Sequence, residues 1–199
     1  MIRSPLGSTI ISYHPDPEWR TTSAKVLHSR IKLAGDSVYW QNIFRKASDP
    51  TFILLTILWH CLYTWDQALE ELYKHISWLV RLPAMLADSI VLNMHQESKI
   101  IRTNDMNLST ELHVIRAYLL HYESLLVDFE KSVLFIRDTP NPAAAAGIHP
   151  LEEQKTEKNL LDKECKNLLD EIERLERSRD MQNKRLKNAV NLVREALIY

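Results

Sequence analysis

The C-terminal stretch 151–199 carries a heptad pattern, and this pattern limits the folds open to the chain more than any other feature. Apolar residues recur there at alternating spacings of four and three, which places them on one side of a helix. This seam consists of Leu161, Cys165, Leu168, Ile172, Leu175, Leu186, Ala189 and Val193. Polar Arg179 and Gln182 interrupt it. The pattern predicts one long helix, from about Pro150 to Leu197, whose stripe needs a second helix from this chain or another copy.

The composition favours helices over sheets. Only 3 of the 199 residues are glycine, so tight turns are few and many short strands are disfavoured. The hydrophobic fraction of 45% is enough for a core. We therefore expect a mainly all-α fold of two buried antiparallel long helices plus a long, exposed, coiled-coil-like stalk helix. The N-terminal segment is poorly defined, with one short strand in TIISY and a helix over Ser23–Leu33.

A long helix is expected after the dipeptide Asp49-Pro50. Asp is a favoured N-cap and Pro a favoured first helical residue, so the helix should run from about 50 to 79. Its apolar stripe is Leu54, Leu58, Cys61, Trp65, Leu69, Leu72 and Ile76. Further apolar residues at its front predict burial nearly all round there. Pro83 should break this helix, because proline removes a backbone donor.

A second long helix should run from Asn107 or Ser109 to Arg137. Its stripe keeps helical spacing throughout. The stripe consists of Leu108, Leu112, Ile115, Leu119, Tyr122, Leu126, Phe129, Val133 and Ile136. Together these patterns divide the chain into an N-terminal segment 1–46, mixed or partly disordered, a helical core 47–137 with an atypical insertion at 80–96, a Pro/Ala linker 138–150 and a charged stalk helix 151–199.

The nearly apolar stretch Phe52–Tyr63 raises the question of a membrane span. About 12 residues rising 1.5 Å each cover about 18 Å of a hydrocarbon core of about 30 Å. We therefore predict a buried core helix. The N-terminus also has no apolar region typical of a secretory signal. Two cysteines on separate helices fit a reducing compartment, which predicts a cytoplasmic location.

No residue constellation points to catalysis or to a resident cofactor, so an enzyme is not expected. His113 and His121 lie eight residues apart, about 12 Å along a helix, whereas two histidines that share a metal sit three or four apart. Any metal ligands remain unknown. A formal net charge of −1 gives no reason to expect nucleic-acid binding. The basic run 174–187 is interpreted as a solvated coiled-coil face, with phosphate binding as the alternative.

Four stretches together point to a known family. They are LLTILWHCLYTWDQALEELYKHI, TNDMNLSTELHVIRAYLLHYESLLVDFEKSVLFI, DTPNPA and LLDKECKNLLDEIERLERSRDMQNKRLKNAVNLV. Over roughly residues 47–79 and 97–193 the chain resembles the fungal CorA-like magnesium transporter proteins. The resemblance implies a cytosolic helical region below the membrane, with the last helix as a stalk that continues into the first span. In the bacterial relatives five copies surround one pore, and the family moves Mg²⁺ or related divalent cations.

The chain departs from this family in two places. No apolar span and no Gly-Met-Asn signature follow the stalk, so we expect a truncated cytosolic portion that is not transport-competent alone. In a full-length relative it would lie at the cytosolic face of the membrane. The stretch 80–96 interrupts a join that the family makes directly. It begins with Val and ends with Gln, whose codons can start with GT and end with AG, so a retained intron and a real insertion both stay open.

The alternative function is a soluble coiled-coil interaction protein with no transport role, because a heptad seam serves either purpose. A pentamer would favour the transporter portion, and a dimer or a foreign partner the interaction protein. A monomer with an uncovered seam would expose a long apolar stripe, which soluble monomers avoid. We therefore predict self-association or a helix partner through 151–199, or else a fold-back onto the helix 107–137.

Overall fold

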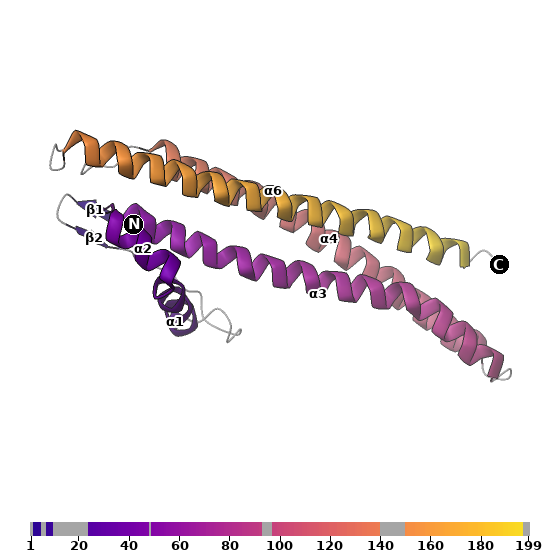
Figure 1. Cartoon of the computed structure of the whole chain (residues 1–199). Helices are drawn as coiled ribbons and strands as arrows, with labels where there is room; N and C mark the ends of the chain where they lie inside the picture. Colours follow the sequence, from indigo (N-terminus) through magenta and orange to yellow (C-terminus); the bar gives the residue numbers. More distant parts are fainter. Residues whose placement is uncertain are drawn as a thin grey trace. The chain divides into compact units, whose positions relative to one another are not determined.

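The chain is mainly α-helical, as the sequence predicts (Figure 1). The computed structural model describes residues 2–4, 7–9, 24–47, 49–92, 97–139 and 150–196. In chain order the elements are β1 (Ile2–Ser4), β2 (Gly7–Thr9), α1 (Ala24–Gly35), α2 (Val38–Lys46), α3 (Thr51–Leu92), α4 (Glu97–Asp138) and α6 (Leu151–Ala196).

The two short strands pair antiparallel, with Arg3 opposite Ser8. The sequence predicted one strand over residues 9–13, whereas the structure places Thr9 at the end of β2. The rest of that stretch, and residues 140–149 of the predicted linker, lie outside the described residues. The helix expected over Ser23–Leu33 is present as α1.

The chain forms two compact units. The first comprises Met1–Thr64 and Phe129–Ile172, and the second comprises Trp65–Asp128 and Glu173–Tyr199. Helices α3, α4 and α6 each have residues in both. The four-part division of the sequence at 46, 137 and 150 stays a prediction.

The core of the second unit is a three-helix cluster. Its buried members are Leu72, Ile76, Leu79, Leu112, Ile115, Leu119, Leu186 and Ala189. Two contacts give the direction of α3 and α4. The rings of Trp65 and Tyr122 meet edge to face with centroids 5.2 Å apart, and His75 Nε2 lies 3.7 Å from Glu111 Oε2. Residue numbers rise along α3 as they fall along α4, so these helices are antiparallel, as expected.

In the first unit, helix α2 was missed from the sequence because nine residues are too few for a clear apolar period. Ser37 begins it as N-cap, and its hydroxyl accepts a hydrogen bond from the Trp40 backbone N–H at 3.4 Å. The helix buries Trp40 and Ile43, which are each 5% exposed. The N-terminal segment therefore contributes to the core of this unit.

Helix α3 begins where the sequence signal predicts. Asp49 Oδ1 accepts a hydrogen bond from the backbone N–H of Thr51 at 2.8 Å and another from its hydroxyl at 2.5 Å. This satisfies one of the amide donors that a helix start leaves unpaired. Asp49 is 9% exposed, so water could not easily replace it.

The prediction that Pro83 breaks this helix was wrong, because α3 continues to Leu92. A proline inside a helix removes one hydrogen bond and costs about 3 kcal/mol, but it does not forbid helical backbone on either side. Helix α4 likewise begins at Glu97, well before the predicted Asn107. Most of the stretch 80–96 therefore lies within α3, and its origin stays open.

The predicted core face of α3 was partly wrong. Its front half buries Phe52, Leu55 and Leu62, whereas the predicted Leu54 and Leu58 are only partly buried. Cys61 and Trp65 are partly buried as well. The front is also not buried all round, because Ile53 is 40% and Tyr63 65% exposed. In a window that is apolar on every side, periodicity cannot select the face that packs.

The stripe on α4 was predicted correctly where side chains are described. Its fully buried members are Leu112, Ile115, Leu119, Leu126, Val133 and Ile136. Tyr122 and Phe129 are partly buried, and the side chain of Leu108 lies outside the described set. Within the described residues, no helix has both the length and the apolar content that a bilayer span requires.

Truncation of the α6 seam should destabilise the chain strongly. Leu168 is 0% exposed, so Leu168→Ala should lower the free energy of unfolding by about 2–5 kcal/mol. Leu192→Ala is the matched control, because Leu192 lies on the same helix at 55% exposure and should change stability by less than about 0.5 kcal/mol. Urea unfolding followed by circular dichroism measures both. Equal losses in the two variants would contradict the placement of the seam.

Candidate functional site

The heptad seam of α6 lies in the interior of the chain. Its described members are at most 7% exposed. They are Leu161, Cys165, Leu168, Ile172, Leu175, Leu186 and Ala189. Val193 lies within α6, but its side chain is outside the described set. The expectation of an exposed rod was therefore wrong, and the predicted alternative, a fold-back onto the helix 107–137, is present in the second unit, where the apolar stripes of α3 and α4 cover the seam. Self-association through 151–199 stays a prediction.

The polar break in the seam is held by an ion pair to α4. The Arg179 side chain is 14% exposed, and its Nη1 lies 2.6 Å from Glu123 Oε2. Its Nη2 donates to Asp180 Oδ1 at 2.7 Å. Two buried polar atoms in this layer, Arg179 Nε and Gln182 Oε1, have no hydrogen-bond partner. Unpaired buried polar atoms lower the free energy of unfolding. The layer therefore serves to align α6 with α4 more than to stabilise the fold.

Two arginines of the basic run on α6 contact residues of α3. Arg174 Nη2 donates to both carboxylate oxygens of Asp66 at 2.8 Å. The guanidinium of Arg185 lies 4.5 Å from the centroid of the Tyr73 ring, which is a cation–π geometry. Residue numbers rise together along both helices, so α6 runs parallel to α3 in the second unit. The cations of the run other than Arg179 are exposed, as a solvated coiled-coil face would be, and the phosphate alternative stays open.

A buried carboxylate joins α6 to α2 in the first unit. Glu164 is 2% exposed, and its Oε2 accepts a hydrogen bond from the Tyr39 hydroxyl at 2.5 Å. Burial, followed by the hydrogen bond and charge of Glu164, raises the pKa of Tyr39 above its ordinary value. This pair was missed from the sequence. The only available signal was the place of Glu164 directly beside the seam residue Cys165.

Burial shifts the pKa values of the two cysteines and of His60 in the direction that favours their uncharged forms. Burial raises the pKa of the Cys165 thiol to about 11 and also raises the pKa of Cys61. Thiols with such pKa values are poor nucleophiles at neutral pH. Burial, and secondarily the charge of Arg30, lowers the pKa of His60, which favours the neutral imidazole. Cys165 is buried and Cys61 partly buried, which fits their places in the apolar stripes that the sequence predicts.

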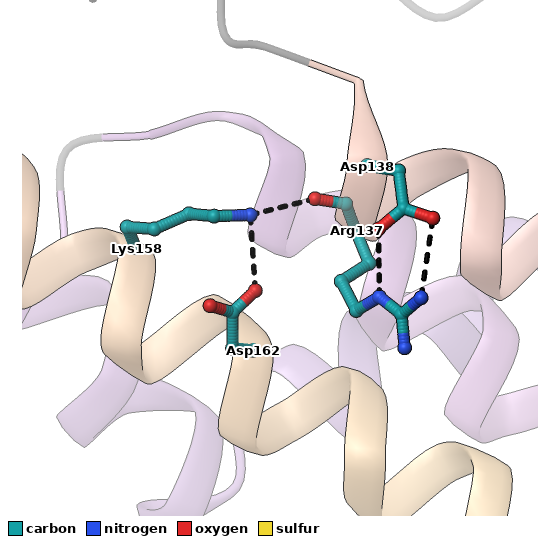
Figure 2. Close-up of polar contacts among 4 residues, drawn as sticks. All are labelled: Arg137, Asp138, Lys158 and Asp162. Carbon is teal, nitrogen blue, oxygen red and sulfur yellow. Dashed lines mark hydrogen bonds and ion pairs between the residues drawn. The ribbon is translucent and has the colours of Figure 1, made fainter.

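The end of α4 is fastened to the start of α6 by a surface contact. Figure 2 shows Lys158 reaching from α6 to the backbone carbonyl of Arg137, with Nζ and O 2.7 Å apart. Lys158 also pairs with Asp162 at 3.0 Å, and Arg137 makes two hydrogen bonds to Asp138. The guanidinium of Arg137 lowers the pKa of Asp138. The lysine thus satisfies one of the carbonyls that a helix end leaves unpaired.

The described residues contain no group of three His, Cys, Asp or Glu side chains that could hold a metal ion. His113 and His121 are both exposed on α4, as surface polar residues would be. What the structure brings together instead is a set of helix faces and the polar contacts between them.

The chain matches no protein-family model, and neither a curated protein nor a solved structure is significantly similar to it.

Replacement of the polar layer by leucine should stabilise the chain. Arg179→Leu combined with Gln182→Leu removes two unpaired buried atoms and restores the apolar period of the seam. Each orphaned atom costs about 1–3 kcal/mol, and loss of the Arg179–Glu123 ion pair offsets part of the gain, so the free energy of unfolding should rise by about 1–3 kcal/mol in total. Arg177→Leu is the control, because that side chain is 69% exposed. A lower thermal midpoint in the double variant would show that the polar layer is stabilising.

Alkaline pH should weaken the first unit through Tyr39. Its pKa is raised in the folded chain, so the neutral phenol contributes stability that is complete below the ordinary tyrosine pKa of about 10. That contribution is lost as pH rises from there towards the higher folded pKa. Urea midpoints should therefore fall more steeply above about pH 10 in the unmodified chain than in Tyr39→Phe. Parallel pH profiles for the two proteins would rule out a hydrogen-bonded, raised-pKa phenol at this position.

Proposed function

We propose that this chain is the cytosolic helical portion of a CorA-like divalent-cation transporter. In this proposal it lies at the cytosolic face of a membrane and contributes to assembly and gating, whereas conduction of Mg²⁺ or a related cation belongs to the membrane spans of the family. The proposal assigns no catalytic residue and no resident cofactor. The ion is cargo, and its ligands are not assigned to residues of this chain.

The observation that carries the proposal is helix α6. It comprises 46 residues, which at 1.5 Å each make a rod of about 69 Å. Its seam keeps heptad spacing across one polar break, its first half is rich in acids and its second half in bases. A stalk that connects a cytosolic helical layer to a membrane needs this length, because it must transmit displacement along its axis. The residue stretches that resemble the family cover the same helix and the two helices packed against it.

The interaction protein remains a second candidate because of one specific observation. The seam of α6 is already covered by α3 and α4 of the same chain in the second unit. A single copy therefore buries its main apolar stripe, and this burial does not require the four other copies of a pentamer. A helical interaction protein with no transport role would have this property, and would use the outer faces of its helices to bind.

The first test is the sequence of the mature transcript. If the transporter proposal is correct, the message should continue past the Tyr199 codon into two apolar spans with Gly-Met-Asn between them. A stop codon directly after Tyr199 in every mature message would contradict it. Reads across codons 80–96 decide separately between a retained intron and a real insertion.

The oligomeric state separates the two candidates at the protein level. Sedimentation equilibrium of the purified full-length product should give a pentameric mass for a transporter subunit. A monomer or a dimer would favour the interaction protein.

A further inference from the structure

A groove runs along the second unit where α4 and α6 meet. It encloses about 300 Å³ and is lined by residues 112–123 of α4 and 179–191 of α6. The contact between Glu123 and Arg179 lies at one end of both ranges. Each wall covers about 18–20 Å of helix at 1.5 Å per residue. An elongated hollow between two helices has the shape that accepts a third helix.

The groove has an apolar floor and exposed aliphatic walls. Leu112, Leu119 and Leu186 line it while being 2–6% exposed, so they belong to the packed core. Leu120 from α4 and Val190 from α6 line it as well, but are 60% and 41% exposed. Single exposed aliphatic residues are ordinary, but one near each end of an apolar groove gives two places where aliphatic side chains of a partner could be buried.

The charge at the rim is predominantly positive. The described lining residues include three cations, Arg116, Arg179 and Lys187, and one carboxylate, Glu123. Glu123 is paired with Arg179 at 2.6 Å, which leaves the exposed Arg116 and Lys187 on opposite walls without an acid of the groove beside them. A partner with carboxylates over both walls would form ion pairs with these two cations, whereas a basic partner would be repelled.

We propose that this groove binds an acidic amphipathic helix of a partner protein. Because Glu123 lies opposite Arg179, α4 and α6 run antiparallel along the groove. Leu120 and Val190 therefore lie near its opposite ends, and Arg116 and Lys187 lie midway. The helix would pack one leucine-sized side chain against Leu120 and a second, about two turns away, against Val190. It would place Asp or Glu one turn from each, towards Arg116 and Lys187. Residues three or four apart share a helix face, so one short segment can supply all of these groups. The volume is at the low end for a small-molecule pocket, which fits a side-chain anchor. This inference goes beyond the proposed function and does not depend on it.

The test uses a displayed library of helical peptides of about 20 residues, long enough to span the groove, with one face randomised. Selection on the full chain, with counter-selection on the Arg116→Glu, Lys187→Glu double variant, should enrich sequences with Leu, Ile or Phe one turn from Asp or Glu. The best peptide should bind the double variant at least about tenfold more weakly, as expected when close charge pairs are reversed. Fluorescence anisotropy gives the dissociation constants, and added salt should weaken binding.

The matched control is Lys163→Glu with Lys166→Glu. This pair makes the same change in net charge on exposed positions of α6 that do not line the groove. Peptide binding should be unchanged in it and lost in Leu120→Glu, whose wild-type side chain is too exposed for the change to threaten the fold. Circular dichroism melting checks that each variant is folded.

Several outcomes would overturn the proposal. They are failure to enrich any sequence over the counter-selected variant, enrichment of basic or uncharged sequences, and equal losses in the two charge-reversed pairs. A change in oligomeric mass on Leu120→Glu would assign the groove to a second copy of this chain. Loss of binding to phosphatidylserine vesicles in the Arg116, Lys187 variant, without loss of peptide binding, would assign it to a lipid surface.

Discussion

The rest of the structure depends on the burial of the α6 seam against helices of the same chain. Isolated helices are marginal in water, so each of the long helices needs its apolar stripe covered. In the second unit one core cluster covers the apolar stripes of α3, α4 and α6 together. Ile76 from α3, Ile115 from α4 and Leu186 from α6 are each at most 2% exposed there. Removal of any one stripe would expose part of the other two.

Polar contacts between the helices determine how the apolar faces align. The ion pairs on the helix surfaces are mostly half exposed, and such pairs contribute little free energy. Two of them nevertheless connect different helices at defined points, Arg174 with Asp66 and Arg179 with Glu123. A polar layer inside a heptad seam costs stability but disfavours alternative registers. We infer that these contacts select one alignment among several that the apolar stripes alone would allow.

Burial of the seam within one chain limits the surfaces that can mediate assembly with another copy. Pairing with another copy through the seam would require α6 to separate from α3 and α4, at the cost of exposing the core cluster. Contacts made by outer faces avoid that cost. Assembly in the proposed transporter role and binding in the inferred groove would therefore both use the outer surfaces of α4 and α6, where exposed aliphatic and charged side chains lie together.

The sequence by itself determined the helical class, the α4 stripe, the α6 seam and the cap at Asp49, because each depends on local spacing or on neighbouring residues. Tertiary structure decided which face of α3 packs, since the stretch beginning at Phe52 is apolar on every side. It also decided that the helix continues past Pro83 and that the buried Glu164 meets Tyr39, 125 positions away in the chain. Contacts across such separations leave no periodic signal. They exist only because helices distant in sequence cover one another's apolar stripes.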